Sequence, residues 1–311
     1  MNRTQTTTGL AIAMLVGVWS FSWVVMKSAQ AYCGPFLFGT LACGLGALCA
    51  FAGYASRGKL PRCPPAAFLG IAGVIGVGFF QAFAQLALSG GGAGKTILLI
   101  YSMPFWASAL AWLWLREAPT RAQKIGLGVA AFGLFLVVAP WEAAAVTASL
   151  WALASGLCWA AGSVATRKLM TQGTAVTLVE ASTWQLAVGT IPLAILWAFS
   201  PEHGFTPTPG FIGALAYNAI LCGVPAWALW GLVVKRLPMA GAGLVSLLIP
   251  MAGVGWAWRV LGERPGGIEL AGMAVILIAL ALSSLPARAV VPGAVLADGL
   301  ERGVSEPATG H

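Results

Sequence analysis

Long apolar stretches, separated by short polar turns, run through most of this chain. Ten of them have about the 20 residues that a helix needs to span a bilayer. Charged residues gather in the turns, for example at 57–62 and 116–121, and Thr120 with Gln123 has the spacing of a capping box. The ten predicted helices cover residues 9–29, 35–55, 65–88, 93–115, 121–139, 149–170, 176–199, 210–234, 239–261 and 267–285.

Composition supports a membrane location. The chain is 59% hydrophobic and 8% charged, whereas soluble domains carry roughly 25% charged residues. The net charge of +8 comes from basic residues scattered singly between apolar runs, which is typical of loops at a membrane surface and not of a nucleic-acid-binding face. We therefore expect an all-α membrane protein with ten transmembrane helices, in contact with the lipid bilayer.

One stretch of the sequence occurs twice. A shift of 146 positions carries residues 95–139 onto 241–285. Shared Pro, Trp and Glu in so apolar a chain indicate a duplication. The coinciding pairs are Pro104/Pro250, Trp112/Trp258, Glu117/Glu263 and Pro119/Pro265 at this offset, and Trp19/Trp159 and Lys27/Arg167 at an offset of 140.

The duplication predicts how the chain is divided. Residues 1–140 would form the first five-helix repeat and 141–285 the second. Residues 286–311, rich in Pro, Gly and charge, would form a disordered cytoplasmic tail. Because five is an odd number of spans, the second repeat enters the membrane in the opposite sense. Such inverted repeats are typical of secondary transporters.

The distribution of Lys and Arg predicts the orientation. With the N-terminus in the cytoplasm, 13 of the 17 basic residues lie in cytoplasmic segments and 4 in outer segments. Cytoplasmic loops carry an excess of basic residues. We therefore expect a multi-pass protein of the inner (plasma) membrane with both termini in the cytoplasm.

The residue inventory excludes several classes of function. The two histidines, His203 and His311, lie outside the predicted spans, and the single aspartate is Asp298. An intramembrane haem, zinc protease or Ser/His protease needs a histidine within a span. P-loop and dinucleotide-binding motifs are missing, and the six cysteines lack metal-binding spacing. We expect no enzyme activity, no catalytic residues, no metal and no cofactor.

A short set of polar residues inside the spans forms the candidate substrate site. A polar side chain in hydrocarbon costs free energy unless it faces a cavity or a partner. Gln81 and Gln85 are four residues apart, so they share one helical face. Together with Tyr101 and Asn218 they are predicted to line one cavity. Interhelical hydrogen bonding is the alternative interpretation.

Two tryptophans and one lysine extend this site. Trp19 and Trp159 lie near mid-span instead of at the membrane interfaces. Ring faces at that depth suit an aromatic or cationic solute, although core packing explains them equally well. Lys95 opens a predicted helix, where a cation opposes the helix dipole. It is therefore a candidate for holding a substrate carboxylate.

Three further residues are candidates for driving a transport cycle. Pro104 and Pro250 each free a backbone carbonyl near mid-span, so we predict hinges there, with simple packing kinks as the alternative. Glu180 is the only carboxylate clearly inside a predicted span, and a buried carboxyl can exchange a proton. It is the predicted coupling residue. The alternative is an ion pair with Arg167 or Lys168.

These features resemble the drug/metabolite transporter superfamily, specifically its ten-helix EamA-type exporters, over residues 9–285. The likeness rests on a mid-span Trp followed by a basic residue in each half, and on Gly-Glu-x-Pro at 262–265. Gly126 and Gly272 match the glycine that follows this turn in the family. The Arg-Glu-Ala-Pro at 116–119 departs at its first position, and an arginine frequent early in the second span is missing from 39–49.

The resemblance implies alternating access around a cavity lined by spans 1, 3, 4, 6, 8 and 9, with spans 5 and 10 at the periphery. Family members export amino acids, nucleobases, drugs and other small metabolites. We expect an exporter of small metabolites, either amino acids or amphipathic and aromatic compounds. It would use proton antiport or facilitated diffusion, as a monomer or a homodimer. The alternatives are a choline- or lipid-type permease and a non-transporting membrane scaffold.

Overall fold

The computed structural model describes residues 3–139, 143–201, 204–223, 225–226, 229 and 239–283. These residues are largely helical, and a short bridge joins Cys33 to Phe205. Seven helical segments are long and apolar enough to cross a membrane, and three shorter apolar helices accompany them. Together they follow the order of the ten predicted spans, so the all-α membrane fold is confirmed. The predicted tail, 286–311, lies outside the described residues.

The first half contains five spans, two of them interrupted. The third span passes from a short α-turn through a π-helix into an α-helix, and the fourth is broken near its middle. The elements are α1 (Arg3–Ala29), α2 (Pro35–Ala55), α3 (Ala66–Phe68), η1 (Leu69–Phe79), α4 (Phe80–Gly90), α5 (Ala93–Ile100), α6 (Met103–Leu115) and α7 (Arg121–Val138).

The second half follows the same order. Its eighth span again contains a π-helical segment, at the position that corresponds to part of η1 when the sequence is shifted by 143 residues. The elements are α8 (Ala143–Thr171), α9 (Leu178–Phe199), α10 (Pro209–Ala216), η2 (Tyr217–Leu221), α12 (Met239–Leu261) and α13 (Gly267–Ser283). Both α1 and α8 begin earlier than predicted, because Thr, Gln and Ala residues continue the helix beyond its apolar part.

Side chains cap the starts of two spans in the same way. The Thr120 hydroxyl accepts a hydrogen bond from the Gln123 amide (3.2 Å), and the Gln123 side chain accepts one from the Thr120 amide (2.8 Å). This confirms the predicted capping box, which satisfies two helix amides that lack a partner within the helix. Thr177 and Glu180 form a second capping box at the start of α9.

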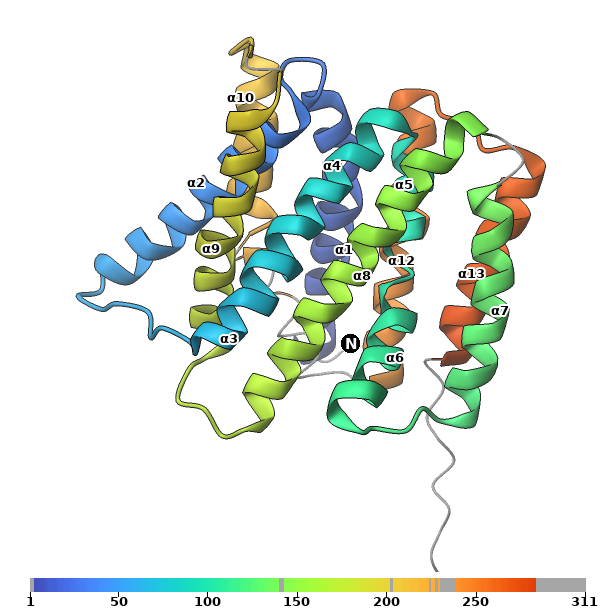
Figure 1. Ribbon diagram of the computed structural model, residues 1–311, viewed down its shortest axis with the longest axis horizontal. Helices are drawn as coiled ribbons and strands as arrows, with labels where there is room; N and C mark the ends of the chain where they lie inside the picture. Colours follow the sequence, from blue (N-terminus) through green and yellow to red (C-terminus); the bar gives the residue numbers. More distant parts are fainter. Residues whose placement is uncertain are drawn as a thin grey trace, which may run out of the picture.

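Figure 1 shows the helices side by side, with α7 and α13 at one edge and α2 toward the opposite edge. The α4–α5 and α12–α13 turns lie at one end of the bundle, at the top of the figure, which we name the Glu263 face. The α6–α7 and α8–α9 turns lie at the other end, which we name the Glu117 face. The peripheral position of α7 and α13 agrees with what the resemblance implies for spans 5 and 10.

Glycines let the closest helix pairs approach. A Cβ built on Gly133 of α7 would lie 3.0 Å from the carbonyl oxygen of Gly272 in α13, and one on Gly76 would lie 2.5 Å from the Cα of Gly162 in α8. Without a hydrophobic driving force between membrane helices, such small-residue contacts supply much of the packing. The α7–α13 and η1–α8 pairs therefore depend on these glycines.

We expect Gly133→Ala to destabilise the folded protein by about 1–3 kcal/mol, because the added methyl group meets backbone and overpacks the crossing. Unfolding in detergent, followed by tryptophan fluorescence, measures the change. Gly128→Ala in the same helix is the control, since a Cβ there meets nothing within 4 Å. Equal stability of the two variants would contradict the tight crossing.

Candidate functional site

The fourth span is broken at Tyr101 and Ser102, between α5 and α6. The Ser102 amide (3.2 Å) and hydroxyl (2.6 Å) both donate to the Leu99 carbonyl, which would otherwise lose its helical partner. Pro104 follows in the first turn of α6, where its missing N–H costs nothing. Gly156 of α8 packs directly on the break, since a Cβ there would lie 2.9 Å from the Ile100 carbonyl oxygen.

Tyr101 lies at this break in a group of aromatic rings, which we name the Tyr101 cluster: Trp23, Phe80, Tyr101 and Trp159. Tyr101 is 7% exposed and meets Trp159 (5.3 Å between centroids) and Trp23 (6.5 Å) edge to face. Trp159 also contacts Phe80 at 5.5 Å. The cluster joins α1, α4 and α8 at the break, so the structure brings two predicted site residues, Tyr101 and Trp159, together.

A buried amide pair lies between α1 and α4. The Gln30 Nε2 donates to both the carbonyl (2.9 Å) and the Oε1 (2.8 Å) of Gln85, which is fully buried. Among the described residues, Gln85 Nε2 and Gln30 Oε1 have no hydrogen-bond partner. Both atoms are buried, and leaving a buried donor and a buried acceptor without partners costs free energy.

The other predicted polar residues make contacts of their own, across helices for Gln81 and Trp19 and within one helix for Asn218. Gln81 Nε2 lies 3.9 Å from the Cys43 sulfur in α2. Trp19 Nε1 donates to the Cys222 carbonyl (3.5 Å), and Asn218 Nδ2 donates to Ala214 in its own helix (3.2 Å). The prediction that Gln81, Gln85, Tyr101 and Asn218 face a single cavity stays a prediction.

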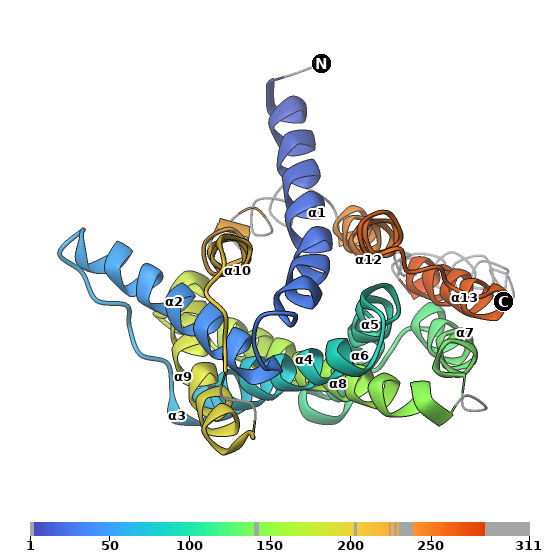
Figure 2. The ribbon, with the colours of Figure 1, turned by 90° about the horizontal axis from the view of Figure 1, so that it is seen from above.

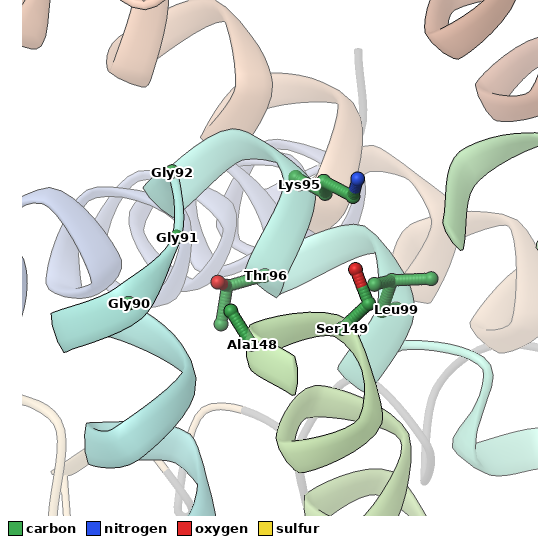
Figure 3. Close-up of a pocket in the computed structure, with 8 residues that line it drawn as sticks. All are labelled: Gly90, Gly91, Gly92, Lys95, Thr96, Leu99, Ala148 and Ser149. Carbon is green, nitrogen blue, oxygen red and sulfur yellow. The ribbon is translucent and has the colours of Figure 1, made fainter. Parts of the chain in front are cut away.

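Lys95 lies in a small pocket at the Glu263 face, about 90 Å³ in volume. Figure 3 shows that the α4–α5 turn, α5 and the start of α8 line it. The lining residues are Gly90, Gly91, Gly92, Lys95, Thr96, Leu99, Ala148 and Ser149. A lysine and small polar side chains suit a single carboxylate, and the volume leaves little room for more.

Glu180 lies in the first turn of α9 and closes a loop. Its carboxylate accepts hydrogen bonds from the Thr177 amide (2.8 Å), the Thr177 hydroxyl (2.9 Å) and the Arg62 amide (3.0 Å). The expected alternative partner, Arg167, pairs instead with Glu117 at 3.0 Å. That part of the sequence interpretation was wrong, because helix packing turns the end of α8 toward the end of α6.

Sequence reasoning missed Gln30 and Trp23. Gln30 follows an apolar span directly, in an Ala-Gln-Ala that looks like ordinary helix-end sequence. Trp23 is one of several tryptophans in an apolar run, with no polar neighbour to single it out. Gln30 could have been noticed because it is a polar residue one turn after Lys27. Trp23 could be recognised only from the packing of α1 against the α5–α6 break.

Comparison with known proteins gives the site its context. The model of the EamA-like transporter family matches residues 7–139 and 146–285. A "probable amino-acid metabolite efflux pump" of Salmonella typhimurium is 26% identical over 282 residues, covering 88% of this chain and 93% of its own. A "probable terminal-alkyne amino-acid exporter" of Streptantibioticus cattleyicolor is 26% identical and covers 70% of this chain and 72% of its own.

A solved structure supports the fold. A chain titled "Crystal structure of protein" superposes with a TM-score of 0.62 at 21% identity, covering 91% of this chain and 99% of that one. The match extends over nearly the whole helical part, and the family model covers both halves. The chain therefore belongs to the EamA-like transporter family.

Proposed function

We propose that this chain exports small metabolites of the amino-acid type across the inner membrane, by alternating access and without chemical conversion. The observation that carries the proposal is the likeness to named amino-acid efflux pumps over almost the full length of both chains. The family model matches residues 7–139 and 146–285, which include all ten predicted spans.

The site chemistry fits a substrate with two opposite charges. Gln85 Nε2 can donate to a carboxylate, and Gln30 Oε1 can accept from an ammonium group. The Tyr101 cluster offers apolar ring surface on α1, α4 and α8 for a side chain. Trp19, Gln81, Asn218 and Lys95 are proposed as further contacts along the path, with Lys95 receiving the carboxylate near the Glu263 face.

Two helix ends diverge from the bundle on the side that we assign to the cytoplasm. Figure 2 shows the Arg3 end of α1 and the Ala55 end of α2 diverging from the bundle, whereas the other ends of both helices lie near its middle. With both termini in the cytoplasm, the diverging ends belong to the cytoplasmic side, and the Glu263 face is the outer one.

Alternating access requires one conformation open to the cytoplasm and one open to the outside. The two halves, 1–140 and 141–285, would move relative to each other between them. We propose Pro104 and Pro250 as their hinges. Pro104 follows a complete break in its span, whereas Pro250 lies inside the continuous helix α12. The fourth span therefore bends more readily than the ninth in this conformation. A homodimer is compatible with the proposal and is not required by it.

Transport into inside-out proteoliposomes of the purified protein tests the substrate class. We expect accumulation from a panel of labelled amino acids. Gln85→Leu should raise the half-saturation concentration by about tenfold, since a hydrogen bond to a charged group contributes roughly 1.5–3 kcal/mol. Gln185→Leu is the control, because Gln185 also bridges two helices, through Thr166, away from the proposed site.

Two results of this assay would contradict the proposal. Uptake of quaternary amines without amino acids would favour the choline- or lipid-type permease. No uptake of amino acids, nucleosides or quaternary amines by well-folded protein would favour the non-transporting scaffold.

Alkaline phosphatase fusions test the orientation. The enzyme is active only outside the cytoplasm, so we expect an inactive fusion after residue 285 and an active one after residue 140, between the two repeats. Protein amounts measured by immunoblot serve as the control. An active fusion after residue 285 would reverse the assignment of the two faces.

Glu180→Gln tests proton coupling. If Glu180 carries the coupling proton, the variant still exchanges substrate at equal pH, but an imposed pH gradient no longer drives accumulation. Thr177→Ala is the matched control: it removes the same capping box, at a cost of about 1 kcal/mol, and leaves the carboxyl in place. Gradient-driven accumulation retained in Glu180→Gln would leave Glu180 with the structural role alone.

A further inference from the structure

Glu263 closes one face of the bundle by capping a helix of another span. It follows α12, and its two carboxylate oxygens accept hydrogen bonds from the amides of Ala93 (2.8 Å) and Gly94 (2.9 Å) at the start of α5. These amides have no partner within their helix, and the helix dipole adds to the attraction. A Cβ on Gly92 would lie 2.9 Å from a carboxylate oxygen, so the turn admits Glu263 because it lacks side chains.

Lys27 holds the other side of the same turn. Its Nζ donates to the carbonyls of Leu88 and Gly91, the latter at 2.9 Å, at the end of α4. An anion thus meets the amides that begin α5, and a cation meets the carbonyls that end α4. The two charges are separated only by the turn between Gly91 and Ala93, and they attach α1 and α12 to it.

The residues next to this cap bring α5 against α12. A Cβ on Gly94 would lie 3.4 Å from the Cβ of Ala257, and Gly253 leaves room for the Ile97 side chain. These contacts close the Glu263 face between the fourth and ninth spans. On the Glu117 face the corresponding half of the fourth span, α6, packs along α8.

The sequence repeat places an equivalent acid and base on the Glu117 face. Glu263 corresponds to Glu117, and Lys27 corresponds to Arg167. There the two side chains bond directly to each other at 3.0 Å, and they are 45% and 58% exposed. One structure therefore shows the same pair of positions in two arrangements: separated and capping helix ends at one face, and joined as an exposed ion pair at the other.

We propose that these four residues form a reciprocal latch, in which Glu263 and Lys27 leave the α4–α5 turn and pair with each other when the Glu263 face opens. The arrangement of Glu117 and Arg167 shows what the opened latch looks like. Water then solvates the released amides and carbonyls, so opening leaves no backbone group unsatisfied. The latch rests on the proposed alternating access and adds to it the residues that hold one face shut.

The helix-capping arrangement is more stable than the exposed ion pair, so the latch favours a closed face. Hydrogen bonds from backbone amides to a partly buried carboxylate are stronger than an exposed ion pair, which contributes little. Removing the charge of Glu263 should therefore destabilise the closed face much more than the open one. Removing the charge of Glu117 should leave the closed Glu263 face unaffected.

Disulfide formation between Gly94→Cys and Ala257→Cys, in a chain whose six native cysteines are replaced, reports closure of the Glu263 face. The 3.4 Å Cβ separation is close to that of a disulfide. We expect rapid cross-linking under mild oxidation. Adding Glu263→Gln or Lys27→Gln should slow it by about tenfold, as expected for one lost charge-assisted contact.

Three variants serve as controls. Lys27→Arg should keep the parent rate, because the equivalent position holds Arg167. Glu269→Gln removes a nearby carboxylate at the position where the first repeat has Gln123, and should also keep the parent rate. Glu117→Gln should not slow the reaction. Parent-like cross-linking in both Glu263→Gln and Lys27→Gln would overturn the latch, and so would equal slowing in Glu269→Gln.

A second pair of cysteines, Lys27→Cys with Glu263→Cys, tests whether the two positions approach each other when the Glu263 face opens. A short bifunctional thiosulfonate serves as the cross-linker. Ala257→Leu, which wedges α12 from α5, should raise this cross-linking several-fold if the open face brings the two positions together. Unchanged or reduced cross-linking in a folded wedge variant would overturn the pairing. Both assays use substrate-free folded protein, so a failure of amino-acid export would leave the latch result intact. A failure of the latch would likewise leave the export assay unaffected.

Discussion

Backbone groups that cannot reach water decide how this molecule is built. In a bilayer every amide and carbonyl must find a partner within the protein. Helix ends and helix breaks are where partners are missing, and here they attract the few charged and polar side chains that the chain has. Glu263 serves the start of α5, Lys27 the end of α4, and Glu180 the start of α9 together with the Arg62 amide.

The broken fourth span shows how this constraint leads to function. At Ser102 the helix departs from its regular hydrogen bonding, because the Ser102 amide and hydroxyl both donate to the Leu99 carbonyl, and Gly156 packs closely on the Ile100 carbonyl. A break that is stabilised by neighbours can bend without exposing backbone to lipid. The Tyr101 cluster lies at this point, so a change in the bend would move the aromatic rings that we propose as part of the substrate site.

The two halves share sequence positions but not environments. Pro104 follows a break, whereas its counterpart Pro250 lies in a continuous helix. Glu263 caps a helix of another span, whereas its counterpart Glu117 pairs with Arg167. The proposed alternating access would account for these differences, because equivalent residues of an inverted repeat then lie at opposite stages of one movement.

The sequence by itself determined the class of structure. The apolar runs set the helices, since no other element with runs of that length satisfies its backbone in lipid. The duplicated Pro, Trp and Glu indicated a repeat, and a mid-span Trp followed by a basic residue, together with the Gly-Glu-x-Pro turn, carried the resemblance to the family. Helix boundaries were also largely readable, as at Thr120 and Gln123, because capping depends on residues three positions apart. Tyr101 was predicted as a site residue because it is polar inside a span, and Trp159 because a tryptophan near mid-span is unusual.

Only the tertiary structure decided which side chains meet. Arg167 or Lys168 was the alternative partner for Glu180 because both are close to it in sequence, yet Arg167 bonds to Glu117. Gln30 became a partner of Gln85 only when the end of α1 packed on α4. Glu263 looked like an ordinary turn residue until the ninth span was set against the fourth. Contacts of this kind join residues far apart in the chain, and their formation depends on how whole helices cross, which the local pattern of residues does not encode.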